Sequence, residues 1–316
     1  MPSHSLSPAP STLGLAFGGG GVRGWTHVGV LSVLERFKLQ PDLVAGSSAG
    51  AITASYLAAG FSVEHMIELM RSQNTRALFS LRFDRYGLVS TEDFAAYLRS
   101  HLGDRRIEDL DLPLYIVCTD LETGKEVVID RGPLVEAVLA SCAMPGIFAP
   151  VRFSGRLLID GGVCNNVPVS ALVNRGATYT VGVQLYKRIG ALTAHGDGTL
   201  DEPDEEVEQR VGLGMWADRV RQRFGRETRE ADDRPNGLEV VQRALDIMMA
   251  QLEGIRLQTY RPDVLIVPRV GSLGLFSYSQ EKEQIFQAGV EAAEQKADEL
   301  ELLAQRVEQL RRGAST

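Results

Sequence analysis

The stretch LVAGSSAGAITASYLAAG, residues 43–60, combines an apolar run, a tight turn and a run of small residues. The apolar start predicts a short buried strand that ends at Gly46, and the small residues after the turn predict a closely packed helix. Ser48 stands in the turn, two residues from Gly46 and from Gly50, which gives the pattern GxSxG. Between a strand and a helix this pattern is typical of a nucleophilic serine held in strained backbone. A serine that only caps the helix is the simpler alternative.

Apolar runs and helical patterns alternate along much of the remaining chain. The predicted strands cover residues 13–17, 43–45, 114–120, 126–130, 156–160, 178–185 and 263–268. Helical patterns begin at residues 25, 49, 134 and 280. Strands that alternate with helices predict an α/β fold with a mostly parallel central sheet covered on both faces.

The composition is that of an ordinary globular protein, with 316 residues, 44% hydrophobic and 23% charged. We predict one domain over residues 13–316, preceded by a flexible Ser- and Pro-rich tail at residues 1–12. The domain carries an insertion at about 196–235, acidic at its start and arginine-rich later, and a C-terminal helix. The net charge of -8 argues against a nucleic-acid partner, because binding phosphates needs a basic surface.

Targeting and ligand patterns are sparse. The opening residues lack the basic start and apolar run of a secretory signal, and no stretch approaches the roughly 18 apolar residues of a membrane-spanning helix. We therefore expect a cytoplasmic protein whose membrane contact is at most peripheral. Cys118, Cys142 and Cys164 lack CxxC spacing and predict free thiols in a reducing compartment. No cluster of His, Cys and Asp has metal-ligand spacing, so we expect no metal and no other cofactor.

A glycine run, GGGGVRG at residues 18–24, follows the first predicted strand. It fits the dinucleotide-binding pattern GxGxxG, but that pattern needs an acidic residue at the end of the next strand, where this chain has GSS. Consecutive glycines let backbone N–H groups turn toward one point, so Gly19, Gly20 and Gly21 predict an oxyanion hole. A purely structural turn is the alternative. The Arg23 side chain would hold this loop, attract an anionic head group or be solvated.

Asp160 ends the predicted strand 156–160 and is followed by Gly161 and Gly162, which permit close backbone approach. In an open α/β sheet the carboxyl ends of the strands share one edge, so Asp160 is expected to meet Ser48 there as its base. An ordinary Asp-Gly turn is the alternative. A conventional triad would add a histidine after the acid, and His195 is the only one downstream. A carboxylate with a pKa of about 3.9 is a weak base, so an oxyanion hole would supply much of the acceleration.

Three segments in order resemble the patatin-like phospholipase family, particularly its bacterial members. They are GGGGVRGWTHVGVLSVLE at residues 18–35, GSSAG at 46–50 and DGG at 160–162. Further similarity lies in ASCAMPGIFAPV at 140–151 and NNVPVSALVNRGA at 165–177. The resemblance covers residues 13–185 strongly and the chain from Asp263 onward more loosely.

The resemblance implies a three-layer α/β/α sandwich and a Ser-Asp dyad without a catalytic histidine. Ser48 would be the acylated nucleophile, Asp160 its base, and Gly19 to Gly21 with the Arg23 backbone the oxyanion hole. The remaining motif glycines would support the site; they are Gly24, Gly46, Gly50, Gly161 and Gly162. One departure is Ser47, where the family frequently has threonine.

These features together predict a serine acyl hydrolase that cleaves lipid esters, of phospholipase A or lysophospholipase type, through an acyl-enzyme intermediate. A general carboxylesterase or an acyltransferase would use the same residues, and a non-catalytic module would bind phosphate at the glycine loop. Head group, acyl length and oligomeric state stay open. Within the insertion, apolar residues fall near one helical face with arginines on the flanks. This face, formed by Val211, Met215, Trp216, Val220 and Phe224, suits a lid or an interfacial helix, or else packs on the domain itself or on a partner chain.

Overall fold

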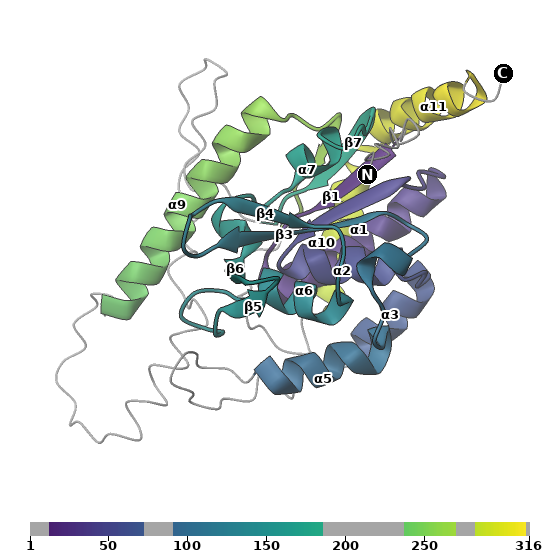
Figure 1. Ribbon diagram of the computed structural model, residues 1–316. Helices are drawn as coiled ribbons and strands as arrows, with labels where there is room; N and C mark the ends of the chain where they lie inside the picture. Colours follow the sequence, from purple (N-terminus) through teal and green to yellow (C-terminus); the bar gives the residue numbers. More distant parts are fainter. Residues whose placement is uncertain (1–12, 73–90, 186–236, 270–281, 314–316) are drawn as a thin grey trace, which may run out of the picture.

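The computed structural model describes residues 13–72, 91–185, 237–269 and 282–313 (Figure 1). Within these ranges the centre is one eight-stranded sheet, with the strand order β5-β6-β3-β2-β1-β7-β8 and with β4 paired to β3. The strands are β1 (Leu13–Phe17), β2 (Leu43–Ser47), β3 (Leu114–Asp120), β4 (Glu126–Ile129), β5 (Val151–Phe153), β6 (Arg156–Asp160), β7 (Tyr179–Val183) and β8 (Val264–Ile266).

Helices cover both faces of this sheet. The α-helices are α1 (Trp25–Arg36), α2 (Ala49–Ala58), α3 (Val63–Ser72), α5 (Thr91–Leu102), α6 (Leu134–Ser141), α7 (Val169–Val173), α9 (Gly237–Thr259), α10 (Lys282–Glu294) and α11 (Ala297–Gly313). Short 3-10 helices are η1 (Gly21–Gly24), η2 (Ile107–Asp109) and η3 (Gly161–Val163).

The alternating side chains of β1 show the two buried faces. Leu13, Leu15 and Phe17 join the larger core cluster, which contains side chains of α1, α2, α6 and α10. Ala16 joins a second cluster with α7, against which Leu257 of α9 packs. Apolar burial on both faces explains the near-continuous apolar runs in the strands and confirms the three-layer α/β/α architecture.

Most of the sheet is parallel, as predicted. The ladders β1/β2, β1/β7, β2/β3 and β7/β8 are parallel, whereas β3/β4, β3/β6 and β5/β6 are antiparallel. The sequence correctly predicts β1, β3 and β6 to the residue. It predicts neither the short strand β5 nor the helix α9, and the single C-terminal helix is in fact α10 followed by α11.

Several predictions fall outside the described residues: the tail at 1–12, the insertion at 196–235 and the apolar face within it. The division of the chain into these parts therefore stays a prediction. None of the helices in the described ranges combines the length and the apolar character needed to cross a membrane.

Two strands meet end to end along one side of β3. Strand β2 pairs with β3 up to Ser47 opposite Val117, and β6 pairs with it from Asp160 opposite Cys118. Strand β4 pairs with the same central residues of β3, so it occupies the other side. The last residues of β2 and β6 therefore pair with consecutive residues of β3, and the two strand ends face each other. The expectation that β6 ends at the same edge because it runs in the same direction as its neighbours was wrong: β6 runs antiparallel to β3, and Asp160 lies at the carboxyl end of β2 because the two strands meet end to end.

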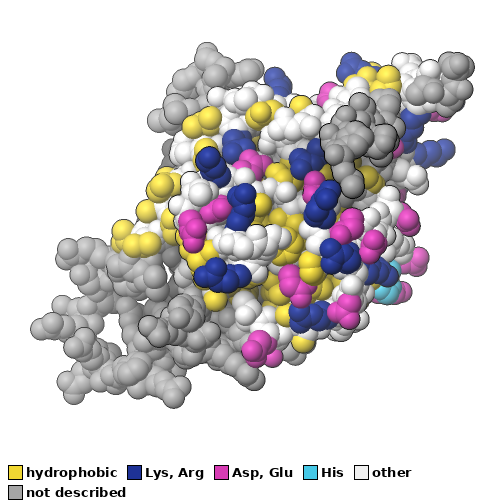
Figure 2. Space-filling model, in the orientation of Figure 1, with side chains coloured by type: hydrophobic (Ala, Val, Ile, Leu, Met, Phe, Trp, Pro, Cys, Tyr) yellow, Lys and Arg dark blue, Asp and Glu magenta, His cyan; other side chains and the backbone are white. Residues whose placement is uncertain are grey.

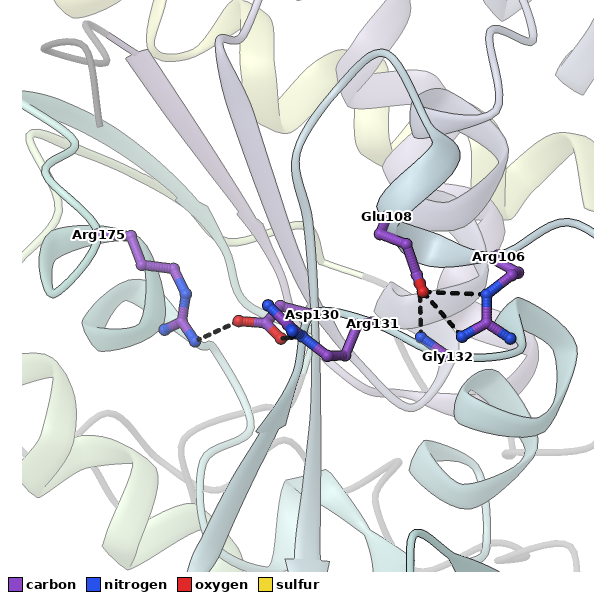
Figure 3. Close-up of polar contacts among 6 residues, drawn as sticks. All are labelled: Arg106, Glu108, Asp130, Arg131, Gly132 and Arg175. Atoms are coloured by element: carbon purple, nitrogen blue, oxygen red, sulfur yellow. Dashed lines mark hydrogen bonds and ion pairs between the residues drawn. The ribbon is translucent and has the colours of Figure 1, made fainter. Parts of the chain in front are cut away.

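Ion pairs and hydrogen bonds hold the segments next to the end of β4, toward the amino end of β3 (Figure 3). Glu108 accepts hydrogen bonds from the Gly132 N–H at 2.7 Å and from the Arg106 guanidinium at 2.8 Å. These bonds hold the pKa of the Glu108 carboxyl below its usual range, with the Gly132 N–H as the main cause. Asp130, just after β4, pairs with Arg175 at 3.6 Å. These contacts secure the turn into α6, away from the meeting point of β2 and β6.

Candidate functional site

Ser48 lies in a strained turn between β2 and α2. Its φ of 52° and ψ of -124° define a backbone conformation that residues other than glycine rarely adopt. A Cβ on Gly50 would collide with the carbonyl of Phe17, and one on Gly46 would collide with the backbone of Gly50. Both glycines are therefore required for the backbone to make this turn. The helix α2 begins at the next residue, and its first N–H groups, which have no partner within the helix, lie beside the serine.

A buried serine of α6 anchors the turn. The Ser48 N–H donates to Ser141 Oγ at 2.9 Å, and Ser141 Oγ donates to the carbonyl of Val117 at 2.6 Å. Ser141 is fully buried, so this link is protected from water. Sequence reasoning missed Ser141, because an isolated serine in a helical pattern carries no signal of such a partner.

Asp160 is brought to Ser48 by the register of β6 on β3. A Cβ on Gly161 would collide with the carbonyl of Val117 and lie 2.5 Å from Ser47 Oγ, so glycine is needed for β6 to end here. Asp160 Oδ1 accepts the N–H of Gly162 at 2.7 Å. Within the described residues, the buried Oδ2 has no hydrogen-bond partner. The Ser48 side chain nevertheless lies close enough to Asp160 to lower the pKa of its carboxyl group.

Burial changes the acidity of Asp160. Its side chain is almost fully buried, and desolvation of the charged form raises its pKa to about 6, against the weaker lowering effects of Ser48 and the Gly162 N–H. The expectation of a weak base with an ordinary carboxylate pKa is therefore wrong. A carboxylate with this pKa accepts a proton more readily and is still mostly ionised at neutral pH.

The glycine loop lies against Ser48. A Cβ on Gly19 would be 2.9 Å from Ser48 Cβ, and one on Gly24 would be 2.9 Å from Ala49 Cβ. The Gly19 N–H donates to Asn166 Oδ1 at 3.0 Å, and the Arg23 N–H donates to the Gly20 carbonyl at 3.2 Å. Two of the four predicted oxyanion donors are thus already engaged.

The amides of Gly20 and Gly21 are the remaining predicted donors. They stand at the start of η1, where N–H groups have no intrahelical partner, and no contact of the described residues uses them. The neighbouring Gly18 N–H donates to the Val183 carbonyl at 3.0 Å. The loop is therefore tied down on both sides of two amides that have no hydrogen-bond partner among the described residues.

Histidine supports this loop without reaching the reacting groups. His27 Nε2 donates to the carbonyl of Gly18 at 2.8 Å, and its ring packs edge-on against Phe17. Burial lowers the pKa of His27 to about 4, so the ring is neutral at physiological pH. His195 lies outside the described residues. Among the residues that are described, no histidine forms a hydrogen bond with Ser48 or Asp160.

The surroundings of Asp160 include two thiols. Cys118 and Cys142 are buried and free, and Cys164 is free and half-buried. Burial raises the pKa of both Cys118 and Cys142, so these thiols stay protonated and compete poorly as nucleophiles. Across the described ranges, no three His, Cys, Asp or Glu side chains gather as metal ligands do.

Comparisons with known proteins agree with these motifs. An uncharacterized NTE family protein of Mycobacterium tuberculosis is 35% identical over 190 residues, which are 56% of this chain and 53% of that protein. Lysophospholipase NTE1 of Scheffersomyces stipitis is 27% identical over 179 residues, 55% of this chain and 12% of that protein. Neuropathy target esterase sws of Drosophila melanogaster is 27% identical over 196 residues, 59% of this chain and 14% of that protein.

The chain spans about half the length of the mycobacterial relative and much less of the other two. Among solved structures, VipD from Legionella pneumophila superposes with a TM-score of 0.48 at 15% identity, over 92% of this chain and 67% of that one. The family described as patatin-like phospholipase matches residues 15–173, about half of the chain, and includes the serine turn, the glycine loop and Asp160. The chain belongs to the patatin-like phospholipase family.

Proposed function

We propose that this chain is a serine acyl hydrolase that cleaves carboxyl esters of lipids, of phospholipase A or lysophospholipase type. The observation that supports the proposal is that the strained Ser48 interacts with the buried carboxyl of Asp160 and packs against the glycine loop at Gly19. The names of two relatives, a lysophospholipase and an esterase, support an ester substrate.

The proposed reaction has two steps. Asp160 Oδ2 accepts the proton of Ser48 Oγ as that oxygen attacks the ester carbonyl. The tetrahedral intermediate collapses, and the leaving alkoxide takes the proton from Asp160 to depart as an alcohol. Water then attacks the acyl-serine, with Asp160 as base again, and the fatty acid and free serine are released. Neither step needs a group from outside the chain apart from substrate and water.

We assign the oxyanion hole to the N–H groups of Gly20 and Gly21. Donors that are fixed before the reaction stabilise the developing negative charge without reorganising, and each is typically worth about 3 kcal/mol. The N–H groups of Gly19 and Arg23 are held within the protein, so we give these two residues the role of shaping the loop.

Alternative functions use the same geometry. A general carboxylesterase or an acyltransferase would keep the acyl-serine and differ only in the ester or in the alcohol that replaces water. A phosphate-binding module would use the two free amides as an anion site and leave Ser48 unreactive. The alternatives therefore separate on whether Ser48 becomes covalently modified.

Labelling with a fluorophosphonate tests the proposal. We expect one covalent adduct, which Ser48→Ala abolishes and Asp160→Asn slows strongly. Ser47→Ala is the matched control, since this neighbouring serine is fully buried and should be unnecessary for labelling. Undiminished labelling of the Ser48→Ala variant would exclude the proposed nucleophile, and no labelling of the parent would favour the binding module.

We also propose peripheral contact with a lipid surface through α9. The helix exposes a set of large apolar side chains, namely Val240, Val241, Ile247, Met248, Leu252 and Ile255. Figure 2 shows hydrophobic side chains along the edge that α9 occupies in Figure 1. A helix with one apolar face outward and one face on the domain is suited to rest at the boundary of a bilayer. Such contact would bring the site to its lipid substrate.

A further inference from the structure

A buried carboxylate of α9 is connected to the glycine loop. Glu253 is only 2% exposed. Its Oε1 accepts Asn166 Nδ2 at 2.8 Å and its Oε2 accepts Gln184 Nε2 at 2.9 Å. Asn166 Oδ1 in turn accepts the N–H of Gly19 at 3.0 Å. A continuous line of buried hydrogen bonds thus runs from α9 to the loop beside Ser48.

The direction of these bonds is set by Glu253. An ionised carboxylate can only accept, so Asn166 must turn its NH2 group toward Glu253 and its oxygen toward Gly19. The negative charge also polarises the amide and strengthens the bond from its oxygen to the Gly19 N–H. Burial raises the pKa of Glu253, and the bonds from Asn166 and Gln184 oppose this effect. Burying a carboxylate costs free energy unless its oxygens are satisfied, and here both are.

We infer that Glu253 is a positioning residue of the hydrolytic site, which acts through Asn166 to hold Gly19 so that the amides of Gly20 and Gly21 face the oxyanion. The inference rests on the proposed function. Glu253 lies beyond the part of the chain that matches the family, residues 15–173. The helix α9, which lies outside the matched segment, would therefore supply part of the support of the glycine loop.

Other side chains on the same face of α9 approach the site. Burial raises the pKa of Asp246, and the positive charge of Arg23, in the glycine loop, partly opposes this effect. A Cβ on Gly162 would lie 3.0 Å from Met249 Cε. Positions 246, 249 and 253 are three and four residues apart, which places them on one helical face. This inner face of α9 thus reaches both the loop and the turn after Asp160.

Reversing the hydrogen bonds tests the inference. Glu253→Gln replaces one accepting oxygen with an NH2 group, which then faces another side-chain NH2 donor. Asn166→Asp replaces the donating NH2 group with a carboxylate oxygen, which then faces the carboxylate of Glu253. We expect each single variant to lower kcat on a soluble short-chain ester by about 10-fold or more, with KM within about twofold, because an oxyanion donor is misplaced rather than removed. Combining the two restores complementarity, because the new amide donates to the new carboxylate, which still accepts from Gly19. We expect the double variant to recover to within about threefold of the parent.

Glu126→Gln is the matched control. Glu126 accepts Asn165 Nδ2 at 3.0 Å and pairs with Arg256 of α9 at 2.8 Å, so it also holds α9 to the sheet, without a link to the glycine loop. We expect this change to lower Tm and leave kcat unchanged. Equal loss of kcat in Glu126→Gln and Glu253→Gln would overturn the inference, as would a double variant no better than the singles.

Two further measurements keep the outcomes distinct. If Glu253→Gln is unfolded at the assay temperature, Glu253→Asp keeps the charge but shortens the side chain, and a folded variant with parental kcat would overturn the inference. Ser48→Ala must abolish the parental activity. Activity that survives Ser48→Ala refutes the proposed function itself, whereas Ser48-dependent activity that ignores Glu253 and Asn166 refutes only the positioning role.

Discussion

The chemistry of the proposed site depends on the environment of single residues. Ser48 is reactive in this proposal because its backbone is strained and its side chain is buried beside the carboxyl group of Asp160. Asp160 is a useful base because burial raises its pKa to about 6. The same carboxylate at the surface, with a pKa of about 3.9, would accept the serine proton less readily.

The pH dependence of activity follows from Asp160. The base must be ionised, so kcat/KM for a soluble ester should rise with pH through about 6 and fall below it. The neighbouring thiols of Cys118 and Cys142 stay protonated because burial raises their pKa values, and His27 is neutral at pH values above its burial-lowered pKa of about 4. A pH profile of kcat/KM between pH 4 and 8 is the measurement. An acid limb near pH 4 instead would mean that Asp160 is solvated or is not the base.

At the scale of elements, the packing of helices depends on a pair of glycines. A Cβ on Gly29 of α1 would collide with the carbonyl of Phe286 in α10, and a Cβ on Gly289 of α10 would collide with the carbonyl of Thr26 in α1. The two helices therefore cross at backbone contact. Residues of both helices belong to the larger core cluster, so a shift of α10 would disturb the face that supports β1 and the glycine loop.

We expect Gly29→Ala to lower the free energy of unfolding by about 2 kcal/mol or more, since overpacking a tight contact forces backbone movement. Gly254→Ala is the matched control: this glycine is helical too, and an added Cβ would meet nothing within 4 Å. Because alanine favours helix over glycine, the control should gain about 0.5 to 1 kcal/mol. Urea denaturation of both variants gives the comparison. A stabilised Gly29→Ala variant would show that the two helices are not in close contact.

At the scale of the whole molecule, the two faces of α9 have different roles. Its inner face contacts the glycine loop network, and its outer face exposes apolar side chains. Changing Met248 and Ile255 together to Gln should weaken co-sedimentation with neutral phosphatidylcholine vesicles about 30-fold, if each side chain contributes about 1 kcal/mol on insertion. Hydrolysis of a soluble short-chain ester should be unchanged.

Leu302→Gln, in α11, is the control for this experiment, since Leu302 is 49% exposed and lies on a different helix. We expect its vesicle binding to match the parent. Equal weakening by the control and by the α9 variant would point to general hydrophobic adsorption rather than to a defined face.

The sequence alone was sufficient for features that depend on neighbouring residues. The pattern of GSSAG after an apolar strand predicts a turn that only small neighbours permit, and a Cβ at either flanking glycine would collide with backbone. The apolar runs predict β1, β3 and β6 to the residue, because burial on both faces leaves a continuous run. These are local steric and solvation effects, so the order of neighbouring residues is enough to predict them.

Tertiary structure decided the rest. The antiparallel entry of β6, which sets Asp160 against Ser48, depends on its register along β3, and the pKa of Asp160 depends on how completely its surroundings exclude water. The engagement of Gly19 by Asn166, and of Asn166 by Glu253, joins residues separated by 147 and 87 positions. No local pattern encodes such pairs, because hydrogen bonding and desolvation depend on distance in space and not on distance along the chain.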